Sequence, residues 1–455
     1  MANRFTRSPA HRVILSVILI AYFIIGSLYA ARTPAWQVPD EPAHYNVIRQ
    51  IAETGSLPRL EPGDYDQAYL SELTSKRFPP ELPIEKVQYQ DYQPPLYYLL
   101  LAPVYLAFAG ALLPLRLVSL LLGAGVIVFA FRAVAELFPA RPYLALTTAG
   151  LMAFIPQHVA MLAGVNNDSL SELLIAIGLW LALRFNRRGW TAAVELWPLA
   201  LVLGLAFLTK VQAYALAPVF ALLLLLRWRR TGELRLFLGS ALTVFLPALL
   251  LGALYWGRNW FVCGPADVVC GRWHNQVVVG QPTTSDWIAQ YGWWGSASSL
   301  LPRFLKFTFD SFWGVFGWMG VFMDSRIYTV LLVFSLALLV GAAAAVRGWP
   351  RLTPAERAGL GLLLLSGLTT LGLYLYYNLN FVQHQGRYLF PALIPIALAA
   401  AVGIRQWAKW GLKLLHLSPS GRVGAGELLL SLLLLALMAA LDVVALYRFV
   451  LPQLT

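Results

Sequence analysis

The chain has 455 residues, of which 59% are hydrophobic and only 12% are charged, and its mean hydropathy is +0.65. A water-soluble domain does not carry that balance, so soluble enzymes are excluded. The net charge of +12 would suit nucleic acid. However, its Lys and Arg residues lie mostly in short segments between apolar runs, which is a signal of membrane topology, so no nucleic-acid partner is expected.

Eleven apolar runs approach or reach the length that crosses the ~30 Å hydrocarbon core of a bilayer. The first has a longer apolar core than the usual ~7 to 15 residues of a signal peptide, so we expect it to stay as an anchor. The sequence therefore predicts an all-α polytopic membrane protein with about 11 transmembrane helices, forming a single domain over residues 1–455. The runs cover residues 13–31, 113–135, 143–163, 169–185, 196–209, 212–227, 235–257, 327–347, 357–378, 387–404 and 427–447.

Basic residues set the expected orientation, because short loops rich in Lys and Arg stay in the cytoplasm. They indicate a bacterial inner-membrane protein with a cytoplasmic N-terminus and two long extracytoplasmic loops, 32–112 and 258–326. The segment 94–111 is apolar enough to span, but a span there would move the basic loop 184–188 outside. We therefore expect it to lie as a juxtamembrane helix in the outer interface. The basic residues include Arg184, Arg187, Arg188, Arg227, Arg229, Arg230, Arg347 and Arg405.

Both cysteines of the chain, Cys263 and Cys270, lie in the second long loop. They form a disulfide if that loop faces an oxidising compartment, and two free thiols are the equal alternative.

Polar residues from five distant stretches occur at the outward ends of the predicted helices, whereas the cytoplasmic loops are basic and plain. Each stretch has a structural explanation when taken alone. An Asp-Glu pair before Pro42 suits the start of a short helix, Asn-Asn-Asp-Ser suits a turn, and an arginine at a helix end can reach the interface. Lys210 is harder to explain, because an ammonium group between two apolar runs is costly. The outward polar residues are Asp40, Glu41, Asp91, Asn166, Asn167, Asp168, Arg258, Asn259, His384, Gln385 and Arg387.

Together, acids and cations that face one outward cavity suit an enzyme whose donor is a phosphorylated lipid, because nucleotide sugars are absent outside the cytoplasm. A carboxylate would accept the proton of the acceptor hydroxyl, and cations would stabilise the departing phosphate. Arginine grips phosphate oxygens in two places, and lysine does so as a point charge.

Four motifs in this order give the sequence a resemblance that covers nearly the whole chain: PDEPAHY, QPPLYY, NNDSL and GRYLFP. They resemble the C-type glycosyltransferase superfamily, which includes protein O-mannosyltransferases, lipid A aminoarabinose transferases and oligosaccharyltransferases. The most similar group is a bacterial family of predicted membrane proteins of unknown function, which also shows features like YWGRNW and FDSFWGVFGWMG.

The resemblance implies an inverting transfer of a sugar from a polyprenyl-phosphate donor to a glycan, lipid or protein acceptor. The reaction would take place outside the cytoplasm, in contact with the membrane lipids. Asp40 would be the catalytic base, supported by Glu41. Asp168 would be the second acidic position, with Asp91 and Asn167 beside the acceptor. Some relatives bind a divalent cation at the second acidic position and others do not, so Mg or Mn at Asp40 and Asp168 is one of two alternatives. The donor phosphate would be held by Arg387, Arg258 and Lys210, with His44, Gln385 and Tyr388 completing the site.

Two alternatives stay open on the sequence. One is a transporter or flippase for lipid-linked sugars, although transporters usually place ionisable residues near the midplane and show paired repeats, and here Lys210 and Asp442 are the few such residues and no repeat is seen. A glycan ligase or polymerase would use a diphosphate-linked donor. Tyr92 and Gln93 also stand where relatives carry His or Glu-Lys before Pro-Pro-Leu, so the acceptor stays open.

Overall fold

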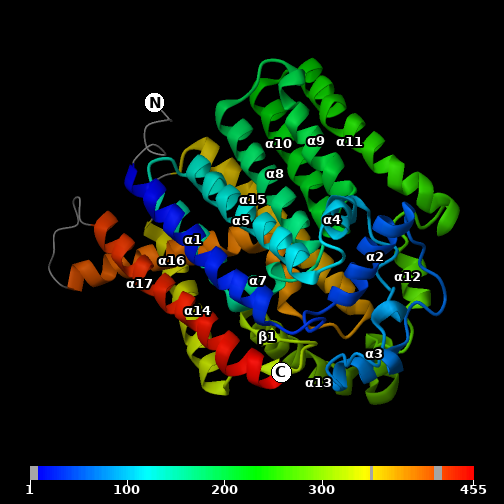
Figure 1. The fold of residues 1–455 in the computed structure, drawn as a ribbon. Coiled ribbons are helices and arrows are strands. Elements are labelled where there is room, and N and C mark those ends of the chain that lie inside the picture. Colours follow the sequence, from blue (N-terminus) through cyan, green and yellow to red (C-terminus); the bar gives the residue numbers. More distant parts are fainter. Residues whose placement is uncertain (1–8, 349–351, 415–422) are drawn as a thin grey trace.

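The computed structural model describes residues 9–348, 352–414 and 423–455, which fold almost entirely into helices (Figure 1). The first half of the chain contains α1 (Pro9–Arg32), α2 (Glu41–Thr54), α3 (Gln67–Ser75), η2 (Ile84–Lys86), α4 (Leu96–Ala107), α5 (Leu112–Leu137), α6 (Pro142–Ala153), α7 (Pro156–Leu162), α8 (Asp168–Arg188), η3 (Ala193–Leu196), α9 (Trp197–Phe207), η4 (Val211–Ala215) and α10 (Leu216–Thr231).

The second half contains α11 (Leu234–Val262), α12 (Gly271–Val277), α13 (Thr284–Trp313), α14 (Ser325–Gly348), α15 (Pro354–Asn380), η5 (Gly386–Ala392), α16 (Leu393–Leu414), α17 (Val423–Val444), η6 (Ala445–Val450) and α18 (Leu451–Leu454). Two short strands, β1 (Val315–Phe316) and β2 (Val321–Phe322), form an antiparallel hairpin in which Val315 pairs with Phe322.

The prediction of a polytopic all-α membrane protein is confirmed, but the number of eleven spans is not. Within the described residues, eight helices are long and apolar enough to cross a membrane, or nine if the bent pair α6–α7 is one span. The run 196–209 corresponds mainly to the short helix α9, and the run 169–185 to α8, which is not among those eight. Both are largely buried inside the molecule.

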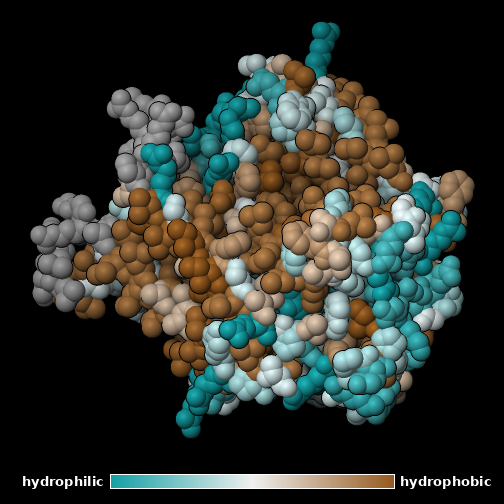
Figure 2. All heavy atoms as spheres, in the orientation of Figure 1, coloured by the Kyte–Doolittle hydropathy of each residue, from teal (hydrophilic) through white to brown (hydrophobic). Residues whose placement is uncertain are grey.

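The outer surface matches a membrane setting. Leucines of α11 such as Leu250 and Leu254 expose 62% and 70% of their surface, as expected for side chains that contact lipid tails. In Figure 2 the surface over α1 and α17 is hydrophobic, whereas the surface over α2, α3 and α12 is largely hydrophilic. The two long loops thus gather at one polar end of a helical bundle.

The segment 94–111 forms α4, a helix of only 12 residues. At 1.5 Å per residue it extends about 18 Å and cannot cross the hydrocarbon core. It packs on α2, which belongs to the same loop. This agrees with the expected juxtamembrane helix and explains why an apolar segment breaks the alternation of the basic loops.

The bend between α6 and α7 measures 68° and has a clear cause in the sequence. Pro156 has no N–H to donate to the carbonyl of Met152, so the α-helical ladder ends there. Nδ1 of His158 lies 2.8 Å from the Met152 oxygen and satisfies it. Nε2 of His158 lies 2.8 Å from Oε2 of Glu172 on α8, which ties the bend to the neighbouring helix.

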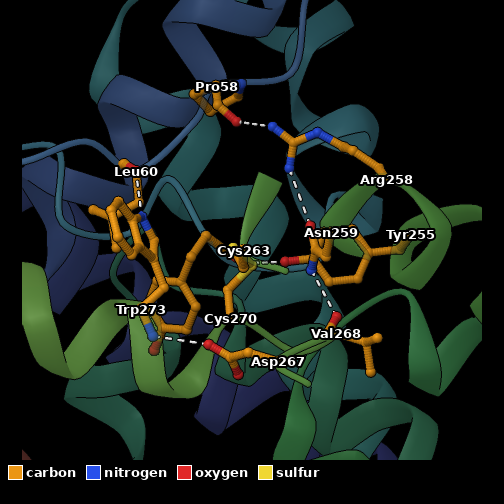
Figure 3. Close-up of a disulfide and its surroundings, with 11 residues drawn as sticks. Pro58, Leu60, Tyr255, Arg258, Asn259, Cys263, Asp267, Val268, Cys270 and Trp273 are labelled. Carbon is orange, nitrogen blue, oxygen red and sulfur yellow. Dashed lines mark hydrogen bonds between the residues drawn. A yellow bond between two sulfur atoms is a disulfide. The ribbon is translucent and has the colours of Figure 1, made fainter. Parts of the chain in front are cut away.

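The two long loops are joined to one another beside the disulfide of Cys263 and Cys270 (Figure 3). Trp273 donates from Nε1 to the carbonyl of Leu60 at 2.7 Å, and Arg258 donates to the carbonyl of Pro58. The structure therefore selects the disulfide from the two alternatives that the sequence left open. This disulfide holds the start of the second long loop in the conformation that contacts the first long loop.

Candidate active site

Asp40 occupies the N-cap position of α2 in the left-handed region, with φ of 68°. This conformation is uncommon for a residue other than glycine and is found where the surroundings enforce it. Its side chain makes no capping hydrogen bond, so the simple role of starting a helix is not the one it has. Instead Oδ2 accepts from Nη2 of Arg387 at 2.6 Å, and Oδ1 accepts from the hydroxyl of Tyr89 at 2.7 Å.

Arg387 comes from η5, at the opposite end of the sequence, and is held from two sides. Gly386 packs so closely on α13 that an added Cβ would lie 2.3 Å from the carbonyl oxygen of Thr308, so no larger residue fits there. Nε of Arg387 donates to Oε1 of Gln385 at 2.7 Å, and Nη1 lies 3.9 Å from the sulfur of Met161. The guanidinium is thereby aimed at Asp40.

Asp168 and Lys210 form a second ion pair, with Nζ 2.6 Å from Oδ1. Lys210 has an extended backbone at the break between α9 and η4, which explains why its ammonium group reaches a partner instead of lying in a helix face. Asp168 begins α8, and its N–H donates to Oδ1 of Asn166 at 2.9 Å. The NNDS stretch is therefore both a turn and the source of a charged group.

The imidazole of His44 is influenced by the charges of both ion pairs. Its Nδ1 lies 2.8 Å from the hydroxyl of Tyr98. Burial and the charges of Lys210 and Arg387 together lower the pKa of His44 to about 3, against the opposing charges of Asp40 and Asp168. His44 is therefore neutral at physiological pH, and all four charged groups lie around it.

The electrostatics around Asp40 are dominated by its cationic partner. Burial alone would raise the pKa of the carboxyl, but the charge of Arg387 and the hydrogen bonds from Tyr89 and Arg387 lower it to about 2. Burial and the charge of Asp40 raise the pKa of Tyr89 well above its usual value, so this hydroxyl keeps its proton and donates it. Asp40 is an ionised acceptor at any physiological pH.

Glu41 has a different setting from its neighbour. It is completely buried, and Arg116 contacts both of its oxygens, with Nη2 2.6 Å from Oε2 and Nε 2.8 Å from Oε1. The backbone N–H groups of Val165 and Trp36 complete its hydrogen bonds. Arg116 uses its remaining N–H groups on the carbonyls of three residues in and after α1, namely Ala30, Thr33 and Pro34. Since this network leaves no free donor or acceptor, it indicates a structural role for Glu41.

The remaining predicted residues divide into two groups. Gln385 and Tyr388 contact Arg387, the latter with its ring centroid 5.3 Å from the guanidinium carbon, and Asn167 lies 3.4 Å from the Tyr98 hydroxyl. By contrast, Arg258 donates to the carbonyl of Pro58 at the junction of the loops, and the structure does not bring it to the ion pairs. Of the three cations predicted to hold the phosphate, Arg387 and Lys210 are the two that form ion pairs with Asp40 and Asp168.

Asp91 is buried, with 5% of its surface exposed, and its Oδ1 has no hydrogen-bond partner. Burial and the nearby charge of Asp64 raise the pKa of this carboxyl to about 8, despite the opposing charge of Arg258. Asp91 therefore carries a proton at neutral pH, in contrast to Asp40. It stays a predicted residue of the acceptor side.

The expected divalent cation does not fit this donor set. Asp40 and Asp168 each have a basic side chain within 2.6 Å, and a cation bound to either would face that positive charge. Within the described parts of the chain, no group of three or more His, Cys, Asp or Glu side chains is arranged to hold a metal ion. The mechanism proposed below therefore uses no metal.

Three features of the site are absent from the sequence-based prediction. Arg116 stands inside an apolar run, and such a charge could have been recognised as a buried partner for an acid. His158 and Glu172 are likewise polar residues in apolar surroundings. Tyr89 lies in an irregular loop 49 residues after Asp40, and no local pattern marks it.

Comparison with known proteins agrees with this architecture. A family model described as dolichyl-phosphate-mannose-protein mannosyltransferase matches residues 92–256, a range that contains Asp168 and Lys210. No curated protein matches the sequence significantly.

Three solved structures cover nearly the whole chain. The oligosaccharyltransferase of Archaeoglobus fulgidus, solved with a tethered acceptor peptide, has a TM-score of 0.52 at 13% identity over 96% of this chain and 55% of its own. The chain thus spans about half the length of that enzyme. ArnT of Cupriavidus metallidurans, bound to undecaprenyl phosphate, has a TM-score of 0.47 at 16% identity over 97% of this chain and 73% of its own. ArnT in the apo state has a TM-score of 0.46 at 15% identity with the same coverage.

At these identities the structural likeness concerns the fold alone. The family model adds an independent match in sequence over residues 92–256. Together they confirm the resemblance that the motifs indicated. Over residues 92–256 the chain is similar in sequence to the dolichyl-phosphate-mannose-protein mannosyltransferase family, and its fold resembles that of the Archaeoglobus fulgidus oligosaccharyltransferase.

Proposed function

We propose that this protein is an inverting glycosyltransferase that transfers a sugar from a polyprenyl-phosphate donor to an acceptor outside the cytoplasm. The observation that supports this most strongly is the meeting of Asp40 with Arg387, next to Asp168 with Lys210. Acids and cations from four distant segments form one site at the polar end of the bundle. Such a site offers a proton acceptor and a phosphate-binding group side by side.

In the proposed reaction, the acceptor oxygen attacks the anomeric carbon from the side opposite the phosphate. The proton of the acceptor hydroxyl passes to Oδ1 or Oδ2 of Asp40, and the bond between the anomeric carbon and the phosphate oxygen breaks. The lipid phosphate leaves with the electron pair and gains one negative charge. Arg387 and Lys210 stabilise that charge, so no general acid is needed for a leaving group of this kind.

The other residues have supporting roles in this proposal. Gln385 and Tyr388 orient Arg387, and neutral His44 and Asn167 both lie at the hydroxyl of Tyr98. Glu41 holds the start of α2 through Arg116 and so fixes the backbone that carries Asp40. Glu41 is therefore proposed to position the base and not to take part in proton transfer.

The proposed location is the extracytoplasmic face of a bacterial inner membrane, with the N-terminus in the cytoplasm. The disulfide in the second long loop supports that side, because disulfides persist in oxidising compartments. The basic loops on the opposite side support the same orientation.

Mass spectrometry of envelope glycans, glycolipids and glycoproteins from cells with and without this protein tests the proposal. We expect one class of molecule to lose a single sugar when the protein is absent, and that loss names both sugar and acceptor. Loss of the sugar together with accumulation of the lipid-linked sugar on the cytoplasmic side would instead identify a flippase, and unchanged glycoconjugates would also overturn the proposal.

A further inference from the structure

The cations that are proposed to hold the donor phosphate are already bound to carboxylates. Nη2 of Arg387 lies 2.6 Å from Asp40, and Nζ of Lys210 lies 2.6 Å from Asp168. A phosphate oxygen that approached Arg387 would share the guanidinium with the Asp40 carboxylate. Two anions on one cation repel each other, so the phosphate and the carboxylate compete.

The same contact limits Asp40 as a base. A carboxylate held by Arg387 and Tyr89 has little affinity for a proton, whereas proton transfer is most efficient when the base has a pKa near the working pH. Asp40 therefore becomes a stronger base when the charge of Arg387 is drawn to another anion. The donor phosphate is the anion that the proposed reaction supplies.

We propose that Asp40 and Asp168 are internal competitors for the donor phosphate, and that binding of the phosphate releases Asp40 to act as the base. This inference rests on the proposed function, and it fixes an order in which the donor binds before the acceptor hydroxyl is deprotonated. The acceptor is then activated only when a sugar is present to receive its attack.

The charge changes of the reaction agree with this competition. When the acceptor proton arrives at Asp40, the carboxyl becomes neutral and loses its attraction for Arg387. In the same step the bond between sugar and phosphate breaks, and the leaving phosphate gains its second negative charge. Arg387 thus changes partner from carboxylate to phosphate at the moment when the phosphate needs it most.

The ion pairs of Asp40 and Asp168 differ in exposure from the structural ion pair of Glu41 with Arg116. The side chains of Glu41 and Arg116 are 0% and 3% exposed, and all five N–H donors of Arg116 are bonded to protein oxygens. Asp40 and Asp168 are 21% and 20% exposed and their cations Arg387 and Lys210 are 7% and 15% exposed, and Nη1 of Arg387 contacts the sulfur of Met161 at 3.9 Å instead of a protein oxygen. The Glu41 pair is closed, whereas the other two remain accessible to a third group.

The test is the affinity of purified protein for undecaprenyl phosphate, titrated in nanodiscs of neutral lipid. Asp40→Asn removes the competing charge from Arg387, and we expect this variant to bind the lipid phosphate about tenfold more tightly than wild type, which corresponds to about 1.4 kcal/mol. Asp168→Asn frees Lys210 and should shift the affinity in the same direction. Arg387→Gln should lose most of the binding.

Glu85→Gln is the matched control, because it removes the same charge from the same loop at an exposed pair with Arg49. It should leave the affinity unchanged. Wild-type protein that binds no undecaprenyl phosphate would contradict the proposed donor class. Wild-type protein that binds it, while Asp40→Asn and Asp168→Asn bind no more tightly, would overturn the competition alone. If one of the two variants fails to fold, the other decides.

Discussion

Arg387 donates a hydrogen bond of 2.6 Å to Asp40 across 347 residues of sequence. The first long loop and the turn before α16 are therefore joined at the charged centre of the molecule. Each residue gives the other its setting: the guanidinium keeps the carboxylate ionised, and the carboxylate holds the guanidinium in a largely buried position. The predictions below follow from this pair and its surroundings.

Arg387→Ala should weaken binding of the lipid phosphate far more than it lowers thermal stability. Loss of a charge-assisted contact to phosphate costs about 1.5 to 3 kcal/mol, or roughly 10-fold to 100-fold in affinity. Arg387→Lys should retain part of the binding, because it keeps the charge and loses the planar fork. Titration with undecaprenyl phosphate beside a thermal melt of each variant checks this, and equal affinities in all three proteins would refute it.

Arg116→Ala should lower the stability of the folded protein and not only its transferase activity. It leaves the Glu41 carboxylate buried without its cation, and breaking a buried ion pair costs about 3 to 5 kcal/mol. Glu41→Gln should have a smaller effect, because the amide still accepts some of the same hydrogen bonds. Thermal unfolding in detergent measures both, and a melting temperature of Arg116→Ala equal to wild type would contradict the structural role.

Asp91 should make stability depend on pH. Its folded pKa of about 8 lies above the unfolded value of about 3.9, so the folded state holds the proton more tightly. Its contribution is complete below pH ~3.9 and is lost as pH rises toward 8, by up to about 1.4 kcal/mol per pH unit. Asp91→Asn cannot titrate, and its melting temperature should fall less between pH 5.5 and 7.5. Parallel curves for the two proteins would argue against a protonated Asp91.

Chelation should leave the rate of transfer unchanged, because both acidic residues of the site have basic partners within 2.6 Å. The measurement is the transfer rate in membranes with and without EDTA, followed by addition of Mg or Mn. A rate that disappears with EDTA and returns with either ion would show that a metal replaces one of these pairs during the reaction.

The sequence predicted the fold class because the apolar runs and basic loops depend on simple physical limits of the bilayer. The count of eleven spans is not confirmed, because short, buried helices such as α9 have the same composition as spanning ones. The meeting of Asp40, Asp168, Lys210 and Arg387 agrees with the motifs. The assignment of Arg258 to the phosphate rested on its place at the outward end of an apolar run, in YWGRNW, and its contact with Pro58 depends on loop geometry that no pattern encodes.

Two adjacent acidic residues, Asp40 and Glu41, have different surroundings in the structure, and the sequence alone does not predict this difference. Asp40 and Glu41 look like one acidic pair, yet one faces the ion-pair site and the other is enclosed by Arg116. The difference comes from the left-handed backbone at Asp40, which turns the two side chains to separate partners. Such a conformation follows from tertiary contacts and not from local propensity.

The central claim is that Asp40 accepts the acceptor proton in glycosyl transfer, and one complementation experiment tests it most directly. Cells that lack the protein receive the wild type, Asp40→Asn, or Asp66→Asn, a matched control that retains the N-cap of α3 in the same loop. At equal protein levels, we expect the missing sugar to return with the wild type and the control but to stay absent with Asp40→Asn, since loss of a general base costs about 10²-fold to 10⁴-fold in rate. Full return of the sugar with Asp40→Asn would contradict the account.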